Sequence, residues 1–292
     1  MNGIREIKSR VLQMLPDRLY LEILFRHRMG YRLNLNNPQT FSEKLQWLKL
    51  YNRNPEYTKL VDKYAVKDYV AGIIGEEYII PTLGVWNKPE DIEWDKLPNQ
   101  FVLKTTQGGG NSGVVICRDK TSFDKQNAIE RLNESLKFDI YKIWREWPYK
   151  NVPKRVIAEK YIDPQPASLD LPDYKFFCFN GDPKYCQVIS GRNEKMCIDF
   201  FDKDWKHQPF HEPKSFSFAD IEPERPKNFE KMLHLAAMIS KGKHFSRIDF
   251  YDVNEKVYFG EITFYPTSGM GGFDPKSWDK LFGDLITLPK NK

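Results

Sequence analysis

Apolar residues recur at helical spacing within the first hundred residues of the chain. Leu45 and Leu48 would lie on one face of a helix, because positions three to four residues apart share a helix face. We expect this helix to begin near Glu43, since Thr40 or Ser42 can cap its amino end. A second helix is predicted after Pro55, with these residues on its inner face: Leu60, Tyr64, Val66, Val70 and Ile73.

Beyond residue 98 the pattern changes to strands joined by short turns. The ranges 101–106 and 113–117 are predicted to pair as a hairpin with a glycine-rich tip. Asn180-Gly181-Asp182 is a strong turn signal between two further strands. The other predicted elements are strands over 155–162, 174–179, 185–190, 196–201, 245–253 and 257–263, and helices over 122–137 and 229–241.

Successive hairpins without a regular alternation of strand and helix predict an α+β protein rather than a parallel doubly wound sheet. We expect three parts along the chain. A helical N-terminal region covers 1–98, a part with the glycine-rich loop covers 99–162, and a strand-rich part covers 163–292. The chain ends in a Gly/Pro-rich loop over 266–275 and a short helix.

Composition narrows the class of protein. The 292 residues are 40% hydrophobic and 29% charged, which is typical of a folded globular protein and excludes a disordered chain. The net charge of +5 suits acidic or phosphorylated small substrates but is too weak and scattered to predict nucleic-acid binding. The four cysteines form no C-x-x-C pair, so neither a zinc site nor a disulfide framework is predicted.

The amino-terminal apolar residues do not predict a targeting signal. They are interrupted at Pro16, Asp17 and Arg18, so we expect no signal peptide and no membrane span. A cytoplasmic protein is therefore predicted.

A lysine followed by glycines is the first motif with candidate chemistry. Lys104 lies near the end of a predicted strand, and Gly108, Gly109 and Gly110 follow it. Glycines allow backbone N–H groups to approach phosphate oxygens closely, and lysine neutralises their charge. The motif is neither a P-loop nor a dinucleotide fingerprint. A flexible hairpin tip with a solvated lysine is the open alternative.

Two other strands carry candidate ligand-binding residues. Glu159, Tyr161 and Ile162 lie at the end of a predicted strand, whose backbone groups can read the edge of an adenine ring. Lys175 lies between two aromatic residues of a strand, and a charge at such a position needs a partner or a ligand. An ordinary amphipathic strand and an exposed lysine are the respective alternatives.

The last predicted hairpin indicates a metal site. It would place Asp249 beside Glu261, with Arg247 on the face of Asp249 and Thr263 on the face of Glu261. Neighbouring carboxylates repel unless a cation lies between them, and Mg²⁺ binds hard oxygen ligands that it shares with phosphates. A cross-strand salt bridge to Arg247 is the alternative.

The order of these motifs resembles the ATP-grasp superfamily, and within it the TupA-like group found in capsule and teichuronopeptide gene clusters. The resemblance covers nearly the whole chain, although the usual N-terminal α/β lobe is replaced by helices. The motifs that carry it are Phe41-Ser42-Glu43-Lys44, Asp62-Lys63-Tyr64-Ala65-Val66, the range 101–113, Asp173-Tyr174-Lys175-Phe176-Phe177, Arg247-Ile248-Asp249 and Gly260-Glu261-Ile262-Thr263-Phe264.

The resemblance implies a fold in which two antiparallel sheets hold ATP between them. Lys104 and Lys175 would contact the phosphates, and the loop from Gly108 to Ser112, with Gly109 and Gly110, would cover them. The carboxylate of Glu159 and the backbone of Tyr161 and Ile162 would meet adenine.

The resemblance also implies the reacting end of the site. Asp249 and Glu261 would hold Mg²⁺, with Thr263 at the position where the superfamily commonly has asparagine. Arg247 would steady an acyl phosphate, and Ser268 with Gly269 would lie in a substrate loop.

The implied activity is an ATP-dependent carboxylate–amine ligase that forms an amide on a uronic acid or amino acid during bacterial surface polysaccharide synthesis. Its expected partners are small acid and amine substrates, peripheral membrane assembly machinery, and no nucleic acid. One alternative is a glycosyltransferase, for which Asp202-Lys203-Asp204 offers a D-x-D pattern. A phosphotransferase and a non-catalytic nucleotide-binding scaffold are the others. Lys44, Lys63 and Lys67 are interpreted as a solvated helix face, with an entry patch for acidic substrates as the alternative.

Overall fold

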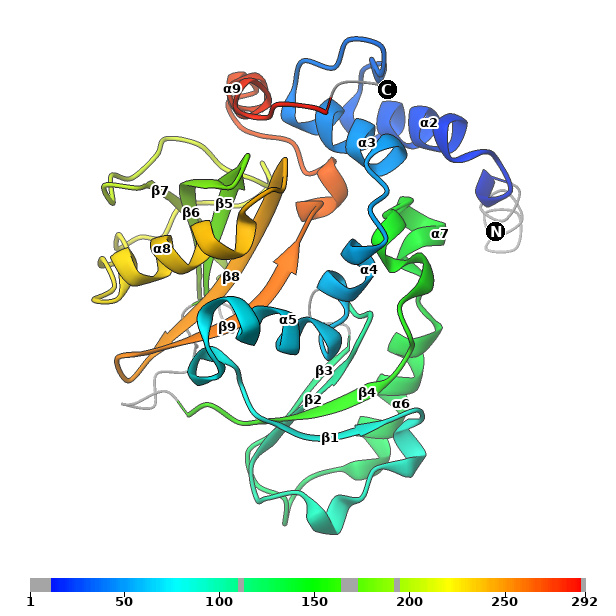
Figure 1. Cartoon of the computed structure of the whole chain (residues 1–292), viewed down its shortest axis with the longest axis vertical. Coiled ribbons are helices and arrows are strands. Elements are labelled where there is room, and N and C mark those ends of the chain that lie inside the picture. Colours follow the sequence, from blue (N-terminus) through cyan, green and yellow to red (C-terminus); the bar gives the residue numbers. More distant parts are fainter. Residues whose placement is uncertain (1–11, 110–112, 164–172, 192–194, 290–292) are drawn as a thin grey trace.

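The computed structural model describes residues 12–109, 113–163, 173–191 and 195–289, and it contains two antiparallel sheets with helices around them (Figure 1). The α-helices are α2 (Asp17–Met29), α3 (Phe41–Tyr51), α4 (Glu56–Val61), α5 (Ala65–Ile74), α6 (Lys125–Lys137), α7 (Ile140–Trp144), α8 (Phe229–Ser240) and α9 (Ser277–Leu285). The 3₁₀ helices are η1 (Glu76–Tyr78), η2 (Pro89–Asp91), η3 (Trp94–Lys96), η4 (Trp147–Asn151) and η5 (Pro266–Gly269).

The smaller sheet has four strands in the order β1-β4-β2-β3. Its strands are β1 (Thr82–Trp86), β2 (Phe101–Thr105), β3 (Val114–Cys117) and β4 (Val156–Lys160). Phe101 and Leu103 of β2 point into a core shared with α6, and Val102 and Lys104 point to the opposite face. This alternation leaves one face of the sheet available to line a cavity.

The larger sheet has five strands in the order β7-β6-β5-β8-β9. Its strands are β5 (Asp173–Phe179), β6 (Asp182–Ser190), β7 (Cys197–Asp202), β8 (Phe245–Val253) and β9 (Lys256–Thr263). Helix α8 covers one face, where Phe176 packs against Phe229. On the other face Phe177 and Phe179 pack against Phe282 of α9, whereas Lys175 points into the space facing the smaller sheet.

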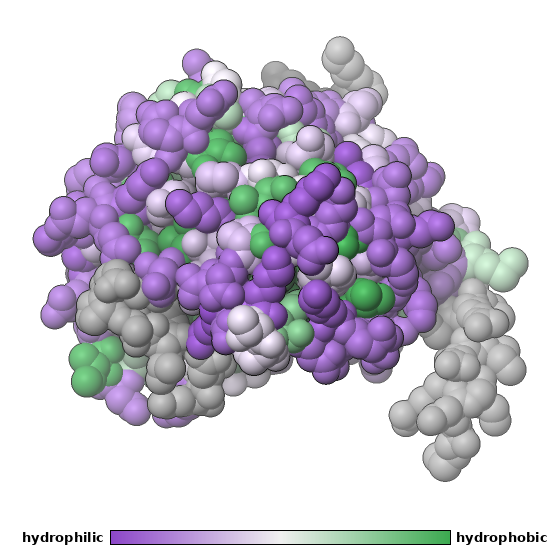
Figure 2. Space-filling model, turned by 90° about the horizontal axis from the view of Figure 1, so that it is seen from below, coloured by the Kyte–Doolittle hydropathy of each residue, from purple (hydrophilic) through white to green (hydrophobic). Residues whose placement is uncertain are grey.

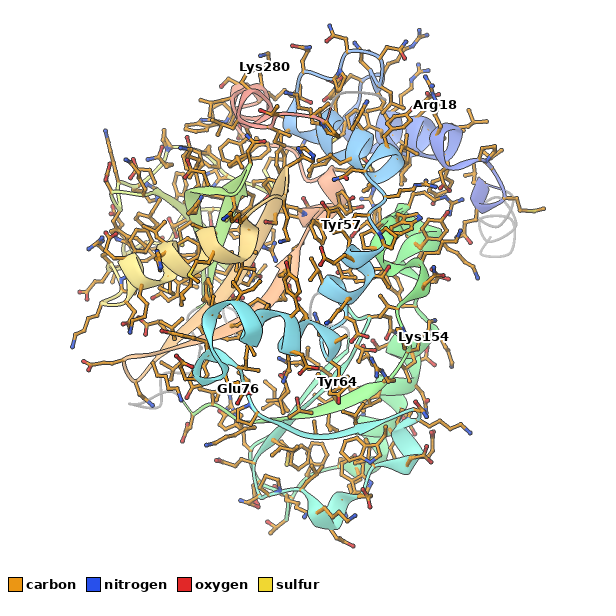
Figure 3. All side chains as sticks on the ribbon, in the orientation of Figure 1. Arg18, Tyr57, Tyr64, Glu76, Lys154 and Lys280 are labelled. Atoms are coloured by element: carbon orange, nitrogen blue, oxygen red, sulfur yellow. The ribbon has the colours of Figure 1, made fainter. Side chains whose placement is uncertain are left out.

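The N-terminal helices connect the two sheets. Thr40 caps α3 in a reciprocal capping box, in which its hydroxyl accepts from the Glu43 N–H at 3.2 Å, so the predicted cap is confirmed. Tyr57 of α4, labelled in Figure 3, stacks on Phe264 just after β9 with ring centroids 4.2 Å apart. Helix α4 therefore fixes the N-terminal region against the end of the larger sheet.

Two local predictions in this region were wrong. The helix expected after Pro55 is broken at Asp62, whose Oδ1 accepts from the N–H groups of Tyr64 (2.9 Å) and Ala65 (3.2 Å), so a new helix begins there. Strand β1 was not predicted at all, and it pairs with β4 within a range expected to be helical. Its Gly84 and irregular register weakened the alternation that would have revealed it.

The surface carries the charge that the composition predicts. Seen from below, the molecule is mostly hydrophilic, with hydrophobic residues in small separate groups (Figure 2). All four cysteines are free and buried. Within the described ranges, no helix has both the length and the apolar character that a membrane crossing requires.

Candidate active site

A cavity of about 1320 Å³ lies between the two sheets. The smaller sheet contributes Lys104 and Glu159, and the larger sheet contributes Lys175, Asp249 and Glu261. The five residues come from four strands that are far apart in sequence. The structure therefore brings together the lysines and carboxylates that the sequence singled out.

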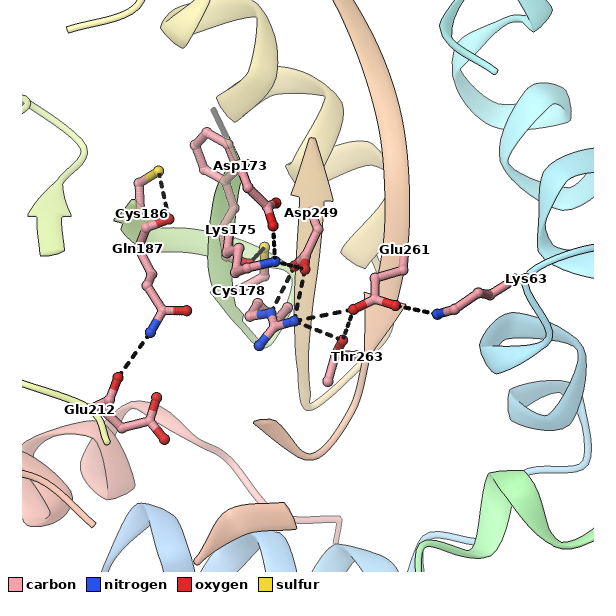
Figure 4. Close-up of polar contacts among 12 residues, drawn as sticks. Lys63, Asp173, Lys175, Cys178, Cys186, Gln187, Glu212, Asp249, Glu261 and Thr263 are labelled. Atoms are coloured by element: carbon pink, nitrogen blue, oxygen red, sulfur yellow. Dashed lines mark hydrogen bonds and ion pairs between the residues drawn. The ribbon is translucent and has the colours of Figure 1, made fainter. Parts of the chain in front are cut away.

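On the larger sheet, Lys175, Arg247 and Asp249 form a compact ionic cluster (Figure 4). The Nζ of Lys175 lies 2.5 Å from Asp249 Oδ2 and 2.7 Å from Asp173 Oδ2. Arg247 donates to both oxygens of Asp249, each at 2.7 Å. Because Asp249 is almost completely buried, these two cations are needed to stabilise its charge.

Three oxygen atoms of β8 and β9 meet at one nitrogen of Arg247. Its Nη2 lies 2.7 Å from Asp249 Oδ2, 3.4 Å from Glu261 Oε1 and 3.2 Å from Thr263 Oγ1. Asp249 pairs directly with Glu261 in the register, which confirms the predicted juxtaposition. Gly260 permits it, because a Cβ there would lie 3.0 Å from the Asp249 carbonyl oxygen.

Glu261 is also bound from the N-terminal region. Lys63 donates from Nζ to Glu261 Oε2 at 2.5 Å (Figure 4). Burial disfavours the charged carboxylate, but Lys63, Lys175 and Arg247 outweigh that effect and hold the pKa of Glu261 well below its ordinary value. Glu261 therefore stays ionised wherever the protein is folded near neutral pH.

On the smaller sheet, Glu159 binds two lysines at once. Its Oε2 lies 2.6 Å from Lys104 Nζ, and its Oε1 lies 2.5 Å from Lys67 Nζ. Burial opposes ionisation of Glu159, but the charges of Lys104 and Lys67 lower its pKa to about 2. The predicted contact of Glu159 with adenine stays a prediction, and its carboxylate has a definite role in holding Lys104.

The charged groups of the two sheets influence one another across the cavity. Burial lowers the pKa of Lys104, but Glu159 reverses this effect, and Glu261 and Asp173 of the opposite wall raise the pKa further. The two walls are thus close enough to act on a single ligand of triphosphate size.

The glycine-rich hairpin packs tightly at its base. A Cβ at Gly108 would lie 2.5 Å from Thr105 Oγ1, and one at Gly113 would lie 2.2 Å from the same atom. Gly109 lines the cavity, and a Cβ there would lie 3.5 Å from Ile140. Gly110 and Ser112, also predicted to bind nucleotide, lie outside the described residues.

The remaining predicted residues divide between the cavity and the packing around it. Tyr161 and Ile162 line the cavity just after β4, beside apolar residues of both sheets. Ser268 also lines it, whereas a Cβ at Gly269 would lie 2.7 Å from the side chain of Gln46 in α3. Gly269 therefore provides close packing of the loop on α3.

The interpretation of three lysines as a solvated helix face was wrong. Lys63 binds Glu261 and Lys67 binds Glu159, while Lys44 donates to two backbone carbonyls at the end of α9. Helical spacing alone could not reveal these contacts, because each partner lies at least 92 positions away along the chain or on another element.

The D-x-D pattern has a structural role. Asp202 Oδ1 accepts from the N–H groups of Asp204 and Lys206, both at 2.9 Å, and so closes the turn after β7. Neither aspartate lines the cavity. This arrangement gives no support to a nucleotide-sugar site at the motif.

The donor set around Arg247 fits a hard divalent cation. Within the described residues, no three His, Cys, Asp or Glu side chains are grouped as a metal centre. Mg²⁺ does not need such a group, since it commonly binds one or two carboxylates together with phosphate oxygens and water. Asp249, Glu261 and Thr263 supply three hard oxygens that already surround one cationic nitrogen.

Two antiparallel sheets that enclose a cavity lined by lysines and paired carboxylates define an ATP-grasp-like α+β fold. The chain belongs to the TupA-like ATP-grasp family, whose model matches residues 43–287. No curated protein matches the chain.

Solved structures with similarity to this chain include D-alanine–D-alanine ligases. The ligase from Bacillus anthracis is 20% identical, with a TM-score of 0.40 over 70% of this chain and 56% of that one. The ligase from Helicobacter pylori is 15% identical, with a TM-score of 0.47 over 87% and 68%. The ATP-grasp ligase PsnB complexed with a minimal precursor is 11% identical, with a TM-score of 0.40 over 76% and 59%. This chain thus spans just over half the length of the Bacillus anthracis ligase.

Proposed function

We propose that the protein is an Mg-ATP-dependent carboxylate–amine ligase that works through an acyl phosphate. One observation carries this proposal: Lys104 and Lys175 face the same cavity as Asp249 and Glu261, from opposite sheets. Membership of the TupA-like ATP-grasp family supports it independently.

The nucleotide would lie between the sheets, with its phosphates near Lys104 and Lys175. Each lysine is already oriented by a buried carboxylate, Lys104 by Glu159 and Lys175 by Asp173 and Asp249. Little reorganisation is then needed when phosphate charge enters the cavity, which is how preorganised sites lower a barrier. Tyr161 and Ile162 would provide the adenine contacts, and the loop from Gly108 to Ser112 would cover the phosphates.

Asp249, Glu261 and Thr263 would hold Mg²⁺, which when bound neutralises charge on the phosphoryl oxygens. Arg247 would turn from these oxygens towards the developing acyl phosphate. Its burial disfavours the charge, but Asp249 and Glu261 raise its pKa further above its ordinary value, so the guanidinium remains a cation throughout.

In the proposed reaction, a substrate carboxylate oxygen attacks the γ-phosphorus and ADP leaves. The amine nitrogen then attacks the carbonyl carbon of the acyl phosphate, the carbon–oxygen bond to phosphate breaks, and an amide forms. These steps need positioning and charge neutralisation rather than a nucleophilic side chain. The acid is proposed to be a uronic acid or amino acid used in bacterial surface polysaccharide synthesis, a role that rests on the family resemblance.

The experiment is a phosphate-release screen of uronic acids and amino acids, each tested with and without amines, in the presence of Mg·ATP. We expect ADP and phosphate to appear only when a matching acid and amine are both present. Absence of ADP with every mixture would contradict the proposal. A stable phosphorylated product formed without amine would instead identify a phosphotransferase.

A further inference from the structure

The cavity continues beyond Arg247 to an end lined by a buried carboxylate. Glu146, which follows α7, is 8% exposed and lines this end together with Trp144, Tyr149 and Ser268. None of the motifs in the sequence pointed to Glu146. A buried acid that faces a cavity is costly unless something compensates its charge.

The nearest cation is already committed to other acceptors. Lys49 of α3 is completely buried, and its Nζ donates to the carbonyl oxygen of Ser268 (2.8 Å), the hydroxyl of Ser268 (2.8 Å) and the carbonyl oxygen of Trp144 (3.0 Å). An ammonium group has three N–H donors, and these three acceptors use all of them. Among the described residues, Glu146 forms no ion pair within 4 Å with Lys49 or any other cation.

The electrostatic effects agree with this geometry. Burial raises the pKa of Glu146, and Lys49 and a hydrogen bond with Ser268 only partly offset it. Burial lowers the pKa of Lys49. A cationic ligand beside Glu146 would remove the cost of its uncompensated charge.

This end of the cavity adjoins the reacting end. The pKa of Tyr149 is raised first by burial and then by the charges of Glu146 and Glu261, and Arg247 lowers it. One phenol therefore senses both Glu146 and the metal-binding side of the site. A group bound at Glu146 would lie close to the carbon atom that Arg247 is proposed to stabilise.

The loop opposite Glu146 is held in an unusual conformation. Thr267 and Ser268 have φ values of +46° and +56°, which lie in the left-handed region. Thr267 donates to Glu212 Oε1 at 2.6 Å, and Lys49 binds Ser268. These contacts keep the Ser268 hydroxyl beside Glu146 at some conformational cost, which is common where a loop positions a ligand.

We propose that Glu146, with Ser268 beside it, binds the ammonium group of the acceptor amine. Glu212 does not fit this role, because its carboxylate already accepts from Thr267 and it does not line the cavity. The inference rests on the proposed ligase function, since it assigns the substrate class of the second step.

The test measures binding and needs no turnover. Ethanolamine, a small primary ammonium, is titrated against the full chain by ligand-observed NMR, with and without Mg²⁺ and the ATP analogue AMPPNP. Ethylene glycol serves as the uncharged probe of similar size. We expect ethanolamine to bind the wild-type protein, and Glu146→Gln to raise its Kd at least tenfold.

Glu134→Gln is the matched control, because Glu134 also lines the cavity but pairs with Lys137 on α6 and is largely exposed. It should bind ethanolamine like the wild type. Equal binding by Glu146→Gln, equal binding of ethylene glycol, or no binding by the wild type would overturn the assignment. If Glu146→Gln does not fold, Glu146→Asp keeps the charge but withdraws it from the cavity, and should weaken binding.

The two proposals fail in different ways. Ethanolamine binding that depends on Glu146, with no ADP release from any acid and amine, would retain the ammonium site and reject the ligase reaction. Amide formation with an unchanged KM for the amine in Glu146→Gln would retain the ligase and reject the ammonium site.

Discussion

Asp249 and Glu261 face each other across β8 and β9, and the same nitrogen of Arg247 contacts both carboxylates. The arginine occupies the position that a cation shared by the two acids would take. The salt bridge and the metal site, which are competing interpretations of the sequence, are therefore compatible as two states of one site: the arginine holds the carboxylates until Mg²⁺ and nucleotide enter.

Removing either carboxylate should abolish the dependence on magnesium. We expect Asp249→Asn and Glu261→Gln to lower kcat by a factor of at least about 100, because each removes a charged oxygen ligand near the transferred phosphate. Phosphate release at increasing Mg²⁺ concentration measures the effect. Asp252→Asn is the control, since Asp252 also lies on β8 but bonds to Asn228 outside the site. Wild-type Mg²⁺ dependence in both variants would contradict the metal assignment.

Thr263 distinguishes this chain from the asparagine common in the superfamily. Thr263→Asn should retain or improve Mg²⁺ affinity, because an amide oxygen is a good hard ligand. Thr263→Val has a similar shape but lacks the hydroxyl that lies 3.2 Å from Arg247, so its Mg²⁺ affinity should fall. The readout is the Mg²⁺ concentration that gives half-maximal turnover. Identical values for wild type and Thr263→Val would show that the hydroxyl is not a ligand.

Glu159 should stabilise the fold in a pH-dependent way. Its pKa is lowered from 4.5 to about 2 by Lys104 and Lys67, against the effect of burial. The stabilisation is therefore complete above pH 4.5 and is lost as the pH falls towards about 2. We expect Glu159→Gln to lower the free energy of unfolding by about 3 kcal/mol at pH 7, because each pKa unit is worth about 1.4 kcal/mol.

Urea unfolding at pH 7 and at pH 3 tests this prediction. The difference between wild type and Glu159→Gln should shrink at the lower pH as the wild-type carboxylate becomes protonated. Glu134→Gln should change the free energy of unfolding by less than about 0.5 kcal/mol, because that side chain is mostly exposed. A difference that is the same at both pH values would refute the ionic origin of the stabilisation.

Two glycines of the same hairpin should respond differently to an added methyl group. A Cβ at Gly113 would lie 2.2 Å from Thr105 Oγ1 and 2.4 Å from Ser135 Oγ, whereas one at Gly109 meets its nearest neighbour at 3.5 Å. Gly113→Ala should therefore destabilise the protein by about 1–3 kcal/mol. Gly109→Ala should leave stability within about 0.5 kcal/mol but raise the KM for ATP, if this part of the loop covers the phosphates.

Thermal unfolding and ATP titration separate the two effects. Equal destabilisation by both alanines would mean that the hairpin tip is packed as tightly as its base. An unchanged KM for ATP in Gly109→Ala would remove this residue from the nucleotide site.

The sequence was sufficient where the relevant contacts are local. The pairing of Asp249 with Glu261 follows from a hairpin, in which alternation and turn length set the register. The Thr40 cap follows from a capping pattern only four residues long. Lys104 and Lys175 were found for the same reason, since alternation along one strand shows which side chains oppose the apolar core.

The contacts between distant elements were decided only by the tertiary structure. Lys63 and Lys67 resemble solvated helix residues until α4 and α5 pack beside the sheets and bring them to Glu261 and Glu159. Lys49 and Glu146 carry no motif, and they face each other only because α3 and the segment after α7 meet at the loop holding Ser268. A local pattern records which face of an element is apolar, but not which element will cover that face. The sequence by itself therefore determined the family, the sheets and the phosphate-facing lysines and carboxylates, whereas long-range packing decided how each charge is compensated.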